Sequence, residues 1–278
     1  LHNFMLIHDD IIDRSDLRRG KPTLHRLLRH AAKTKERDKL GCDLSIIAGD
    51  IVYALAIDAF LSIHEDPKRK ERALKYFIQT AVFTAMGEFV DTLHGVNKLN
   101  RITEDDVFLN YTLKTARYTF DCPLVVGAIL AGADNQDIHG LSELGLMIGQ
   151  AFQIQDDVIG IFDTQKNIGK PILSDLAESK KPILVCHAYD QLKGDMRKKF
   201  LTTFSKPRKT YADLMTIRKI FITSGSLHYS LLKIKKRLER SLKILHRLKM
   251  NRRYRDLIER CLFQLFGHSE MIARKYGV

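Results

Sequence analysis

The sequence predicts an almost wholly helical protein. Proline is scarce, with six among 278 residues, and the apolar content of 45% is enough to fill a sizeable core. Apolar residues recur at spacings of three and four along the long apolar segments, and none of these segments shows the strict alternation of a half-buried strand. We therefore expect an all-α fold, with residues 1–278 forming a single domain.

Helical periodicity marks eight windows along the chain. They run over Leu1 to Ile12, Cys42 to Ile63, Lys68 to Gly95, Thr103 to Ala131, Ile138 to Phe162, Lys180 to Leu192, Tyr211 to Gly225 and Ser226 to Leu248. Thr103, followed three residues later by Asp106, suits a helix N-cap. Gly95 and Gly132 stand where helices can stop. The clearest breaks are at Gly20-Lys21-Pro22 and Gly169-Lys170-Pro171.

Cysteine usage indicates a reducing compartment. The four cysteines lie far apart, with no CxxC pair and no histidine cluster at the spacing of zinc ligands. They are Cys42, Cys122, Cys186 and Cys261. We expect scattered buried thiols and a cytoplasmic protein.

The longest apolar stretch and the net charge indicate which partners the sequence allows. The longest apolar stretch, Ile46 to Ile63, is interrupted by Asp50 and Asp58, so we expect no transmembrane helix. The net charge of +13 is compatible with nucleic acid, an anionic membrane surface or small anionic substrates as partners.

Two acidic clusters interrupt apolar helical windows. In His8-Asp9-Asp10-Ile11-Ile12-Asp13, Asp9 and Asp13 share one helix face; in Gln153-Ile154-Gln155-Asp156-Asp157, Gln153 and Asp157 do the same. One such cluster alone is equally compatible with a solvated helix end and with a cation site. Two such clusters within apolar helices favour the cation site. Carboxylates without histidine or cysteine suit Mg²⁺, which binds one or two carboxylates together with water and substrate phosphates.

Basic residues follow both clusters in the predicted breaks. Arg18-Arg19-Gly20-Lys21-Pro22 follows the first cluster, and Gly169-Lys170-Pro171 and Lys180-Lys181 follow the second. Arginine and lysine there complement a metal-bound diphosphate. Lys114-Thr115, inside an apolar helical window, is a further candidate for an anion contact.

These residues resemble the trans-polyprenyl diphosphate synthases. LIHDDIIDRSDLRRGKPTLH at 6–25 is similar to the family's first aspartate-rich region, and GQAFQIQDDVIGIF at 149–162 to the second. AGD at 48–50, GEFVD at 87–91, KTARYTF at 114–120 and GKPILSDLAESKK from 169 resemble further motifs, in family order. The match runs from Leu1 to about Lys181, whereas the C-terminal third matches only in being helical.

The resemblance implies a fold and an activity. The fold is the isoprenoid synthase-type helical bundle with a central cavity, and the enzyme is a Mg²⁺-dependent homodimer. It condenses isopentenyl diphosphate with an allylic diphosphate: the allylic diphosphate departs, the isopentenyl double bond attacks the carbocation, and a proton is lost to the released diphosphate. Stabilisation of the leaving group in a site that excludes water would be the main catalytic effect.

The resemblance also implies residue roles. Magnesium would be held by Asp9, Asp13, Asp156 and Asp157. The implied catalytic set is Asp9, Asp10, Asp13, Lys114, Asp156, Asp157 and Lys170. The allylic diphosphate would contact Arg18, Lys114, Thr115, Gln153, Lys170 and Lys180. Isopentenyl diphosphate would face His2 and Arg19.

Two departures from the family pattern stand out. The family's Gly-Lys-Arg motif precedes the first aspartate region, and this sequence begins too late to contain it. We expect N-terminal helices of the bundle to be missing, which would leave the isopentenyl diphosphate site incomplete and apolar surface exposed. Gly160 occupies an acidic position of the second motif, and Asp163-Thr164 stands where Gly-Asp is usual; we treat this change as minor.

Product length in this family depends on bulky residues before the first aspartate region. Phe4 and Met5 occupy these positions, and the resemblance favours geranylgeranyl diphosphate over farnesyl diphosphate or a longer product. The same two residues also suit ordinary core packing on an apolar helix.

The sequence is also compatible with two other functions. The chain could be a non-catalytic subunit of a heteromeric synthase, although both acidic clusters argue against this. It could instead bind nucleic acid or an anionic membrane through the basic segment from Lys233 to Arg255. Leucines and isoleucines at helical spacing within that segment favour an amphipathic helix with a solvated basic face. We therefore expect no nucleic-acid partner, and keep peripheral membrane association of the C-terminal third as an alternative.

Overall fold

The computed structural model describes residues 2–31, 33–163 and 180–277, and these are largely helical. The N-terminal elements are α1 (His2–Ile12), β1 (Leu17–Arg18), β2 (Lys21–Pro22), α2 (Leu24–Leu28), α3 (Arg37–Leu61) and α4 (Pro67–Val96). The middle of the chain forms η1 (Leu99–Arg101), α5 (Glu104–Asn110), η2 (Tyr111–Asp121), α6 (Cys122–Leu130) and α7 (Asn135–Phe162). The C-terminal elements are α10 (Ile183–Gln191), α11 (Gly194–Phe204), α12 (Tyr211–Thr223), α13 (Ser226–Arg247) and α14 (Arg252–Tyr276). The predicted all-α class is confirmed.

The described residues divide into two compact units, with the boundary after Lys70 in the first turn of α4. Unit 1 contains residues 2–70, and unit 2 contains residues 71–163 and 180–277. Each unit is considered by itself. The expectation of a single domain over residues 1–278 stays a prediction.

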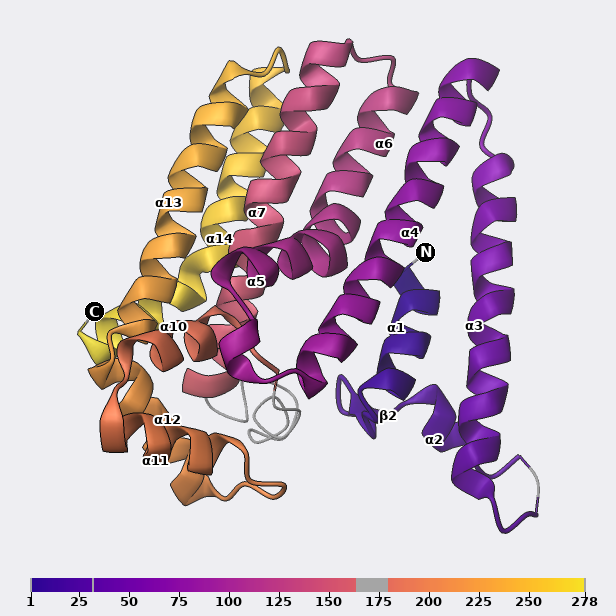
Figure 1. The fold of residues 1–278 in the computed structure, drawn as a ribbon. Helices are drawn as coiled ribbons and strands as arrows, with labels where there is room; N and C mark the ends of the chain where they lie inside the picture. Colours follow the sequence, from indigo (N-terminus) through magenta and orange to yellow (C-terminus); the bar gives the residue numbers. More distant parts are fainter. Residues whose placement is uncertain (1, 32, 164–179, 278) are drawn as a thin grey trace. The chain divides into compact units, whose positions relative to one another are not determined.

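In unit 1, α1 and α2 pack against the long helix α3 (Figure 1). The β1–β2 hairpin between α1 and α2 turns through Arg19 and Gly20, which both have positive φ angles of 54° and 75°. A two-residue hairpin loop with two positive φ angles matches the right-handed twist of its strands. The break predicted at Gly20-Lys21-Pro22 is therefore a tight reversal of the chain.

Helix α3 bears on the expectation that the chain has no transmembrane helix. By length and composition alone it is apolar enough to cross a membrane, although the sequence had excluded such a helix because of Asp50 and Asp58. Core helices of globular proteins pass the same test, so this is weak evidence for a membrane span. Only 17% of its most apolar window is buried within the structure.

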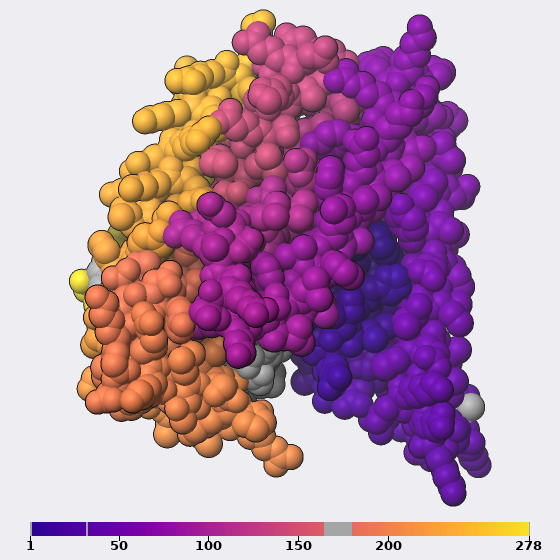
Figure 2. Space-filling model, in the orientation of Figure 1, coloured from indigo at the N-terminus to yellow at the C-terminus, as the bar shows by residue number. Residues whose placement is uncertain are grey.

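The core of unit 2 is built around α7. This helix is in contact with η2, α6, α13 and α14, which run beside it in Figure 1. Leu144, Ile154 and Val158 of α7 are completely buried, because apolar residues at helical spacing supply several faces of the same helix. The space-filling view in Figure 2 shows α10 to α12, in orange, beside the magenta surface of α5, in agreement with the contact between α10 and α5.

The predicted helix from Thr103 to Ala131 is helical throughout but not uniform. Thr103 forms a capping box with Asp106, so the predicted N-cap is confirmed. The residues from Tyr111 to Asp121 then form a π-helix between α5 and α6. Wide helical turns of this kind are rare and are frequently found at functional sites. Gly132 follows α6 with a φ of 74°, as a helix stop requires.

Several boundaries differ from the predicted windows. Helix α3 begins at Arg37, five residues before the predicted start at Cys42, because its first turn is polar and carries no apolar periodicity. Helix α10 begins at Ile183 and not at Lys180, because Pro182 disfavours the helical conformation for the residue before it. Helices α2, α11 and α14 were not among the predicted windows.

The cysteines are only partly buried, which corrects one expectation from the sequence. Cys122 and Cys186 are buried, but Cys42 is half-buried and Cys261 is exposed. All four are free thiols. Cys261 lies on α14, where the apolar face that packs inward contains Leu262 and Phe266.

Candidate functional site

The first acidic cluster lies at the C-terminal end of α1 in unit 1. Asp9 and Asp10 belong to the last turn of the helix, and the backbone N–H of Asp13 donates to the carbonyl of Asp9 at 2.8 Å. The hairpin brings Arg18 back onto this turn. Its Nη2 donates to Asp9 Oδ2 and its Nε to Asp10 Oδ1, both at 2.8 Å. Arg18, predicted to contact diphosphate, thus bridges two carboxylates of the first cluster.

The carboxylates of this cluster differ in exposure. Asp10 is buried, with a relative exposure of 6%, whereas Asp9 and Asp13 are partly exposed. Burial raises the pKa of the Asp10 carboxyl, and the hydrogen bond and charge of Arg18 oppose that rise. Asp9 and Asp13, one helical turn apart on the accessible side, are therefore better placed than Asp10 to meet a cation from solvent.

The two residues predicted to face isopentenyl diphosphate lie near the same hairpin. His2 begins α1, and Arg19 is exposed at the hairpin turn. Burial together with the positive charges of Arg19 and Arg18 lowers the pKa of His2. Burial and the positive neighbours therefore both favour the neutral form of His2. An anion held between these groups would relieve that repulsion.

Phe4 and Met5 lie on α1 in front of the acidic turn. Phe4 is 8% exposed, and its ring packs on Tyr53 of α3 with the ring centroids 4.6 Å apart. Met5 is half-buried. Phe4 thus has a packing role within unit 1, and its predicted role in setting product length stays a prediction.

The second acidic cluster lies in the C-terminal half of α7, in unit 2. Asp156 is exposed and Asp157 is half-buried. Asp157 Oδ1 accepts from Gln153 Nε2 at 3.2 Å, and Asp157 Oδ2 accepts from the hydroxyl of Tyr111. Gln153 Oε1 in turn accepts from Thr115 Oγ1 at 2.7 Å. The predicted pair Thr115 and Gln153 therefore belongs to one hydrogen-bonded network with Asp157.

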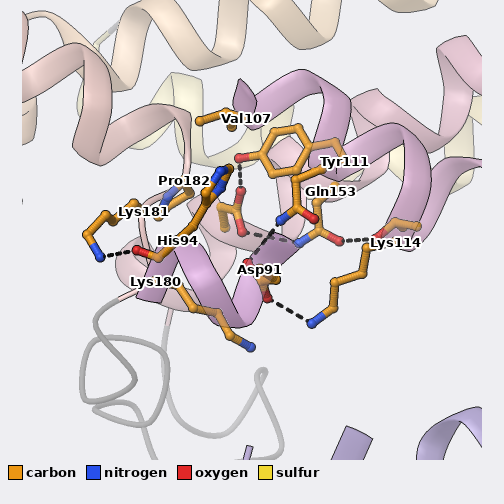
Figure 3. Close-up of a pocket in the computed structure, with 12 residues that line it drawn as sticks. Asp91, His94, Val107, Tyr111, Lys114, Gln153, Lys180, Lys181 and Pro182 are labelled. Atoms are coloured by element: carbon orange, nitrogen blue, oxygen red, sulfur yellow. Dashed lines mark hydrogen bonds and ion pairs between the residues drawn. The ribbon is translucent and has the colours of Figure 1, made fainter. Parts of the chain in front are cut away.

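Lys114 projects into the same pocket and forms ion pairs there. Its Nζ lies 2.8 Å from Glu88 and 2.9 Å from Asp91, both on α4. Asp91 also accepts from Asn110 Nδ2 at 2.9 Å. Burial by itself would raise the pKa of Asp91, but the charges of Lys114 and Lys180 and these hydrogen bonds hold it below its ordinary value. Figure 3 shows Lys114 and Lys180 extending toward the same side of the pocket as Asp91.

Close helix packing positions the π-helical segment that carries Lys114 and Thr115. A Cβ atom on Gly87 of α4 would lie 2.5 Å from the backbone nitrogen of Lys114, and one on Gly149 of α7 would lie 2.3 Å from the Cα of Ala116. No side chain fits at either position without a shift of backbone. These two glycines therefore let η2 approach both neighbouring helices.

The predicted basic residues after the second cluster have different surroundings. Lys180 lines the pocket. Lys181 Nζ donates to the carbonyl oxygens of His94 and Gly95, at 2.5 and 2.8 Å, and so caps the end of α4. Lys170 lies outside the described residues.

The pocket of unit 2 includes residues absent from the predicted site. Tyr111, Asn110, Asp91 and His94 line it together with the predicted residues, and Glu88 pairs with Lys114 beside it. The GEFVD motif contained a signal for Glu88 and Asp91. Tyr111 and Asn110 carry no comparable signal, because their roles depend on packing between η2, α4 and α7.

The donor chemistry of both clusters fits magnesium. Across residues 2–31, 33–163 and 180–277, no group of three or more His, Cys, Asp or Glu side chains is placed to hold a metal by itself. Mg²⁺ does not require such a group, since it commonly takes one or two carboxylates and completes its shell with water and phosphate oxygens. Asp9 and Asp13 in unit 1, and Asp156 and Asp157 in unit 2, supply oxygen ligands of this type.

Solved structures share this helical fold. The geranylgeranyl pyrophosphate synthase from Corynebacterium glutamicum, complexed with isoprenyl diphosphate and magnesium, matches 95% of this chain and 75% of its own chain with a TM-score of 0.86 and 26% identity. The geranylgeranyl pyrophosphate synthetase from Pyrococcus horikoshii matches the same shares with a TM-score of 0.82 and 28% identity. The chain therefore shares the fold of solved geranylgeranyl pyrophosphate synthases.

The family follows from the sequence comparison. The model of the polyprenyl synthetase family matches residues 1–221, and the chain belongs to that family. A short chain isoprenyl diphosphate synthase of Methanocaldococcus jannaschii is 34% identical over 72% of this chain, and a geranylgeranyl diphosphate synthase of Saccharolobus solfataricus is 34% identical over 83%. The chain spans 56% and 65% of the lengths of these two relatives. The resemblance to the trans-polyprenyl diphosphate synthases is confirmed.

Proposed function

We propose that the protein is a Mg²⁺-dependent prenyltransferase that condenses isopentenyl diphosphate with an allylic diphosphate. The observation that carries this proposal is the pocket of unit 2, around which Lys114, Thr115, Gln153, Asp157 and Lys180 are gathered. Lysine ammonium groups and carboxylates around one pocket suit a diphosphate bound together with a divalent cation. Membership of the polyprenyl synthetase family supports the same substrate class.

Each of these side chains has a distinct task in the proposal. Lys114 and Lys180 attract the allylic diphosphate and stabilise the negative charge that grows as it departs. Thr115 and Gln153 maintain the hydrogen bonds that orient Asp157. Asp9, Asp13, Asp156 and Asp157 would hold magnesium, which when bound neutralises charge on the leaving group. By the resemblance, Arg18 and Lys170 would also contact diphosphate, whereas His2 and Arg19 would contact isopentenyl diphosphate.

Geranylgeranyl diphosphate is the proposed product. Relatives from Saccharolobus solfataricus and Sulfolobus acidocaldarius named geranylgeranyl diphosphate synthase support this length at 34% and 32% identity. A geranylfarnesyl diphosphate synthase of Aeropyrum pernix, 31% identical over 89% of this chain, supports a longer product as the second candidate. Phe4 and Met5 are the residues proposed to limit the length.

Product analysis tests the proposal. The protein is incubated with Mg²⁺, labelled isopentenyl diphosphate and a series of allylic primers, and the dephosphorylated products are separated by chromatography. We expect a prenyl product of geranylgeranyl length that disappears with excess chelator and in Asp9→Ala. Failure of the folded protein to form any product with any primer would contradict catalysis by this chain and favour a non-catalytic subunit of a heteromeric synthase.

We also propose that the protein is a homodimer in which a second copy covers α3. Ile46, Ile47, Ile51 and Leu55 of this helix are 45–59% exposed. Exposed apolar surface on this scale marks an interaction site more often than a free surface. Sedimentation in the absence of detergent tests this: a dimer supports a protein partner, whereas a monomer that binds vesicles would favour a membrane partner for α3.

The basic C-terminal helices receive no nucleic-acid role in the proposal. Lys233 pairs with Glu104, Arg240 with Glu143 and Lys249 with Asp134, so part of the positive charge is used within the chain. The remaining charge supports, at most, peripheral association with anionic membranes. Co-sedimentation with phosphatidylserine vesicles at low and high salt tests that association, which should weaken steeply as salt rises.

A further inference from the structure

Tyr111 stands at a junction of three elements around the pocket of unit 2. It is the first residue of η2 and is 5% exposed. Its hydroxyl donates to Asp157 Oδ2 on α7 and accepts, at 3.0 Å, from the backbone N–H of Ile183, the first residue of α10. A single buried hydroxyl therefore connects an acidic side chain of the site to the segment that follows Lys180.

The hydroxyl is held as a donor to the carboxylate. The backbone N–H of Ile183 donates to the phenol oxygen, so the O–H bond of Tyr111 is left to point at Asp157. The ring of Tyr111 packs edge-on against Phe108, with ring centroids 5.8 Å apart, which limits the rotation of the side chain. The direction of the O–H bond is thus set by packing as well as by its two partners.

Asp157 consequently has a defined orientation. One of its oxygens accepts from Tyr111 and the other from Gln153 Nε2. The two donors come from different helices, so they fix the plane of the carboxylate and not only its position. Hydrogen bonds that orient metal-binding carboxylates typically change metal affinity by ~10- to 100-fold when they are removed.

We propose that Tyr111 is a positioning residue for the binding of magnesium diphosphate, through the orientation that its hydroxyl imposes on Asp157. This rests on the proposed function, because it assigns Asp157 to the metal site. Tyr111 also couples Asp157 to the start of α10, just after Lys180 and Lys181. The same hydroxyl therefore contacts both Asp157 and the backbone of Ile183, three residues after Lys180.

A second buried tyrosine supplies a matched control. The hydroxyl of Tyr76 on α4 donates to both oxygens of Asp121, at 2.9 and 2.8 Å, and Asp121 is completely buried. Neither residue lines the pocket. Tyr76→Phe and Tyr111→Phe therefore remove the same group from the same kind of pair, and only one of these pairs faces the proposed site.

The test measures how strongly Mg²⁺ is needed for diphosphate to stabilise the protein. The melting temperature of each variant is recorded with a fixed excess of inorganic diphosphate over a range of Mg²⁺ concentrations. We expect Tyr111→Phe to need a Mg²⁺ concentration ~10- to 100-fold higher than the wild type to reach half of the full increase in melting temperature. Tyr76→Phe should need the wild-type concentration, even where its melting temperature without ligand is lower.

A double variant separates positioning from a general loss of stability. Asp157→Asn keeps an acceptor for Tyr111 but loses the charge that binds the cation. In an Asp157→Asn background, Tyr111→Phe should cause no further change in the Mg²⁺ requirement, since the two residues act through one carboxylate. An additional rise of the same size as in the wild type would overturn the positioning role.

The remaining outcomes distinguish this inference from the proposed function. A wild-type protein that responds to Mg²⁺ and diphosphate, together with an unchanged Mg²⁺ requirement in Tyr111→Phe, would refute the role of Tyr111 alone. An equal change in Tyr76→Phe would also refute it, because the effect would then be structural. A wild-type protein with no Mg²⁺-dependent shift would refute both the proposed function and this inference.

Discussion

The two acidic clusters keep their carboxylates in place by different means. In unit 1, Asp9 and Asp10 share the guanidinium of Arg18, so a positive charge from the chain compensates them. In unit 2, Asp157 is held by the neutral donors Tyr111 and Gln153. A neutral donor orients a carboxylate without cancelling its charge. Tyr111 and Gln153 therefore orient Asp157 and leave its charge unchanged. A cation or anion that binds at the first cluster must instead compete with the ion pairs of Arg18.

The second cluster should depend more strongly on close helix packing. Gly149→Ala places a Cβ against the backbone of Ala116, and we expect it to lower the free energy of unfolding by about 3 kcal/mol. Gly127→Ala in α6 is the control, because no atom lies within 4 Å of its Cβ position. That change should stabilise the protein by about 0.5–1 kcal/mol. Urea unfolding measures both; equal effects would show that packing of η2 on α7 does not hold the second cluster.

The first cluster should depend on charge compensation. Arg18→Met leaves Asp9 and Asp10 without their shared guanidinium, and we expect a loss of about 2 kcal/mol, less than for a fully buried pair because Arg18 is one-third exposed. Thermal or urea unfolding at neutral pH measures this loss. Adding Asp10→Asn should restore part of it, since the repulsion between the two carboxylates then disappears.

An exposed ion pair in unit 1 provides the control for Arg18. Arg26 pairs with Asp16, whose side chain is 62% exposed, so Arg26→Met should cost under about 1 kcal/mol. An Arg18→Met variant as stable as Arg26→Met would show that the first cluster needs no compensating charge.

The pocket of unit 2 also contains charges that compensate one another, because Lys114 forms ion pairs with Glu88 and Asp91. These pairs must compete with an incoming diphosphate. We expect Glu88→Gln to tighten the binding of inorganic diphosphate about fivefold, or ~1 kcal/mol, measured by calorimetry in the presence of Mg²⁺. Glu71→Gln, which breaks the exposed pair with Lys75, should change nothing. Weaker binding in Glu88→Gln would mean that Glu88 assists the anion site.

Asp10 and Asp91 should differ in the sign of their pH dependence. Burial raises the pKa of Asp10 above 3.8, so ionisation of this carboxyl is less favourable in the folded state than in the unfolded state. The stability of the wild type relative to Asp10→Asn therefore falls as pH rises through the raised pKa. For Asp91, burial is outweighed by Lys114 and Lys180, and the pKa is lowered below 3.8. Its contribution is present above pH 3.8 and is lost as pH falls through the lowered value.

Urea unfolding of both asparagine variants from about pH 3 to about pH 6, where aspartates titrate, measures these small effects. Toward low pH, the stability advantage of the wild type over Asp91→Asn should shrink. The stability of the wild type relative to Asp10→Asn should increase over the same range. Parallel trends for the two variants would contradict the different environments of the two carboxylates.

The helical class, most of the helices and the two acidic clusters were predictable from the sequence. Periodicity identifies α1, α4, α7 and α13, because apolar residues recur at spacings of three and four in their sequences. The burial of Ile154, Val158 and Ile161 in α7 follows that spacing. The order of the motifs indicated the family, which the family match over residues 1–221 confirms. Short or charge-rich helices such as α2 and α14 were not predicted, because few of their residues are buried and most of the others are polar or charged.

The sequence by itself therefore determined which residues are proposed to carry the chemistry, because the carboxylates, the lysines and their spacing can be read directly from it. Tertiary structure alone decided how they are held. Arg18 reaches Asp9 and Asp10 only because a hairpin reverses the chain, and Tyr111 meets Asp157 across 46 positions of sequence. Hydrogen bonds act over about 3 Å, so partners of this kind are defined by packing between helices and not by spacing along one of them.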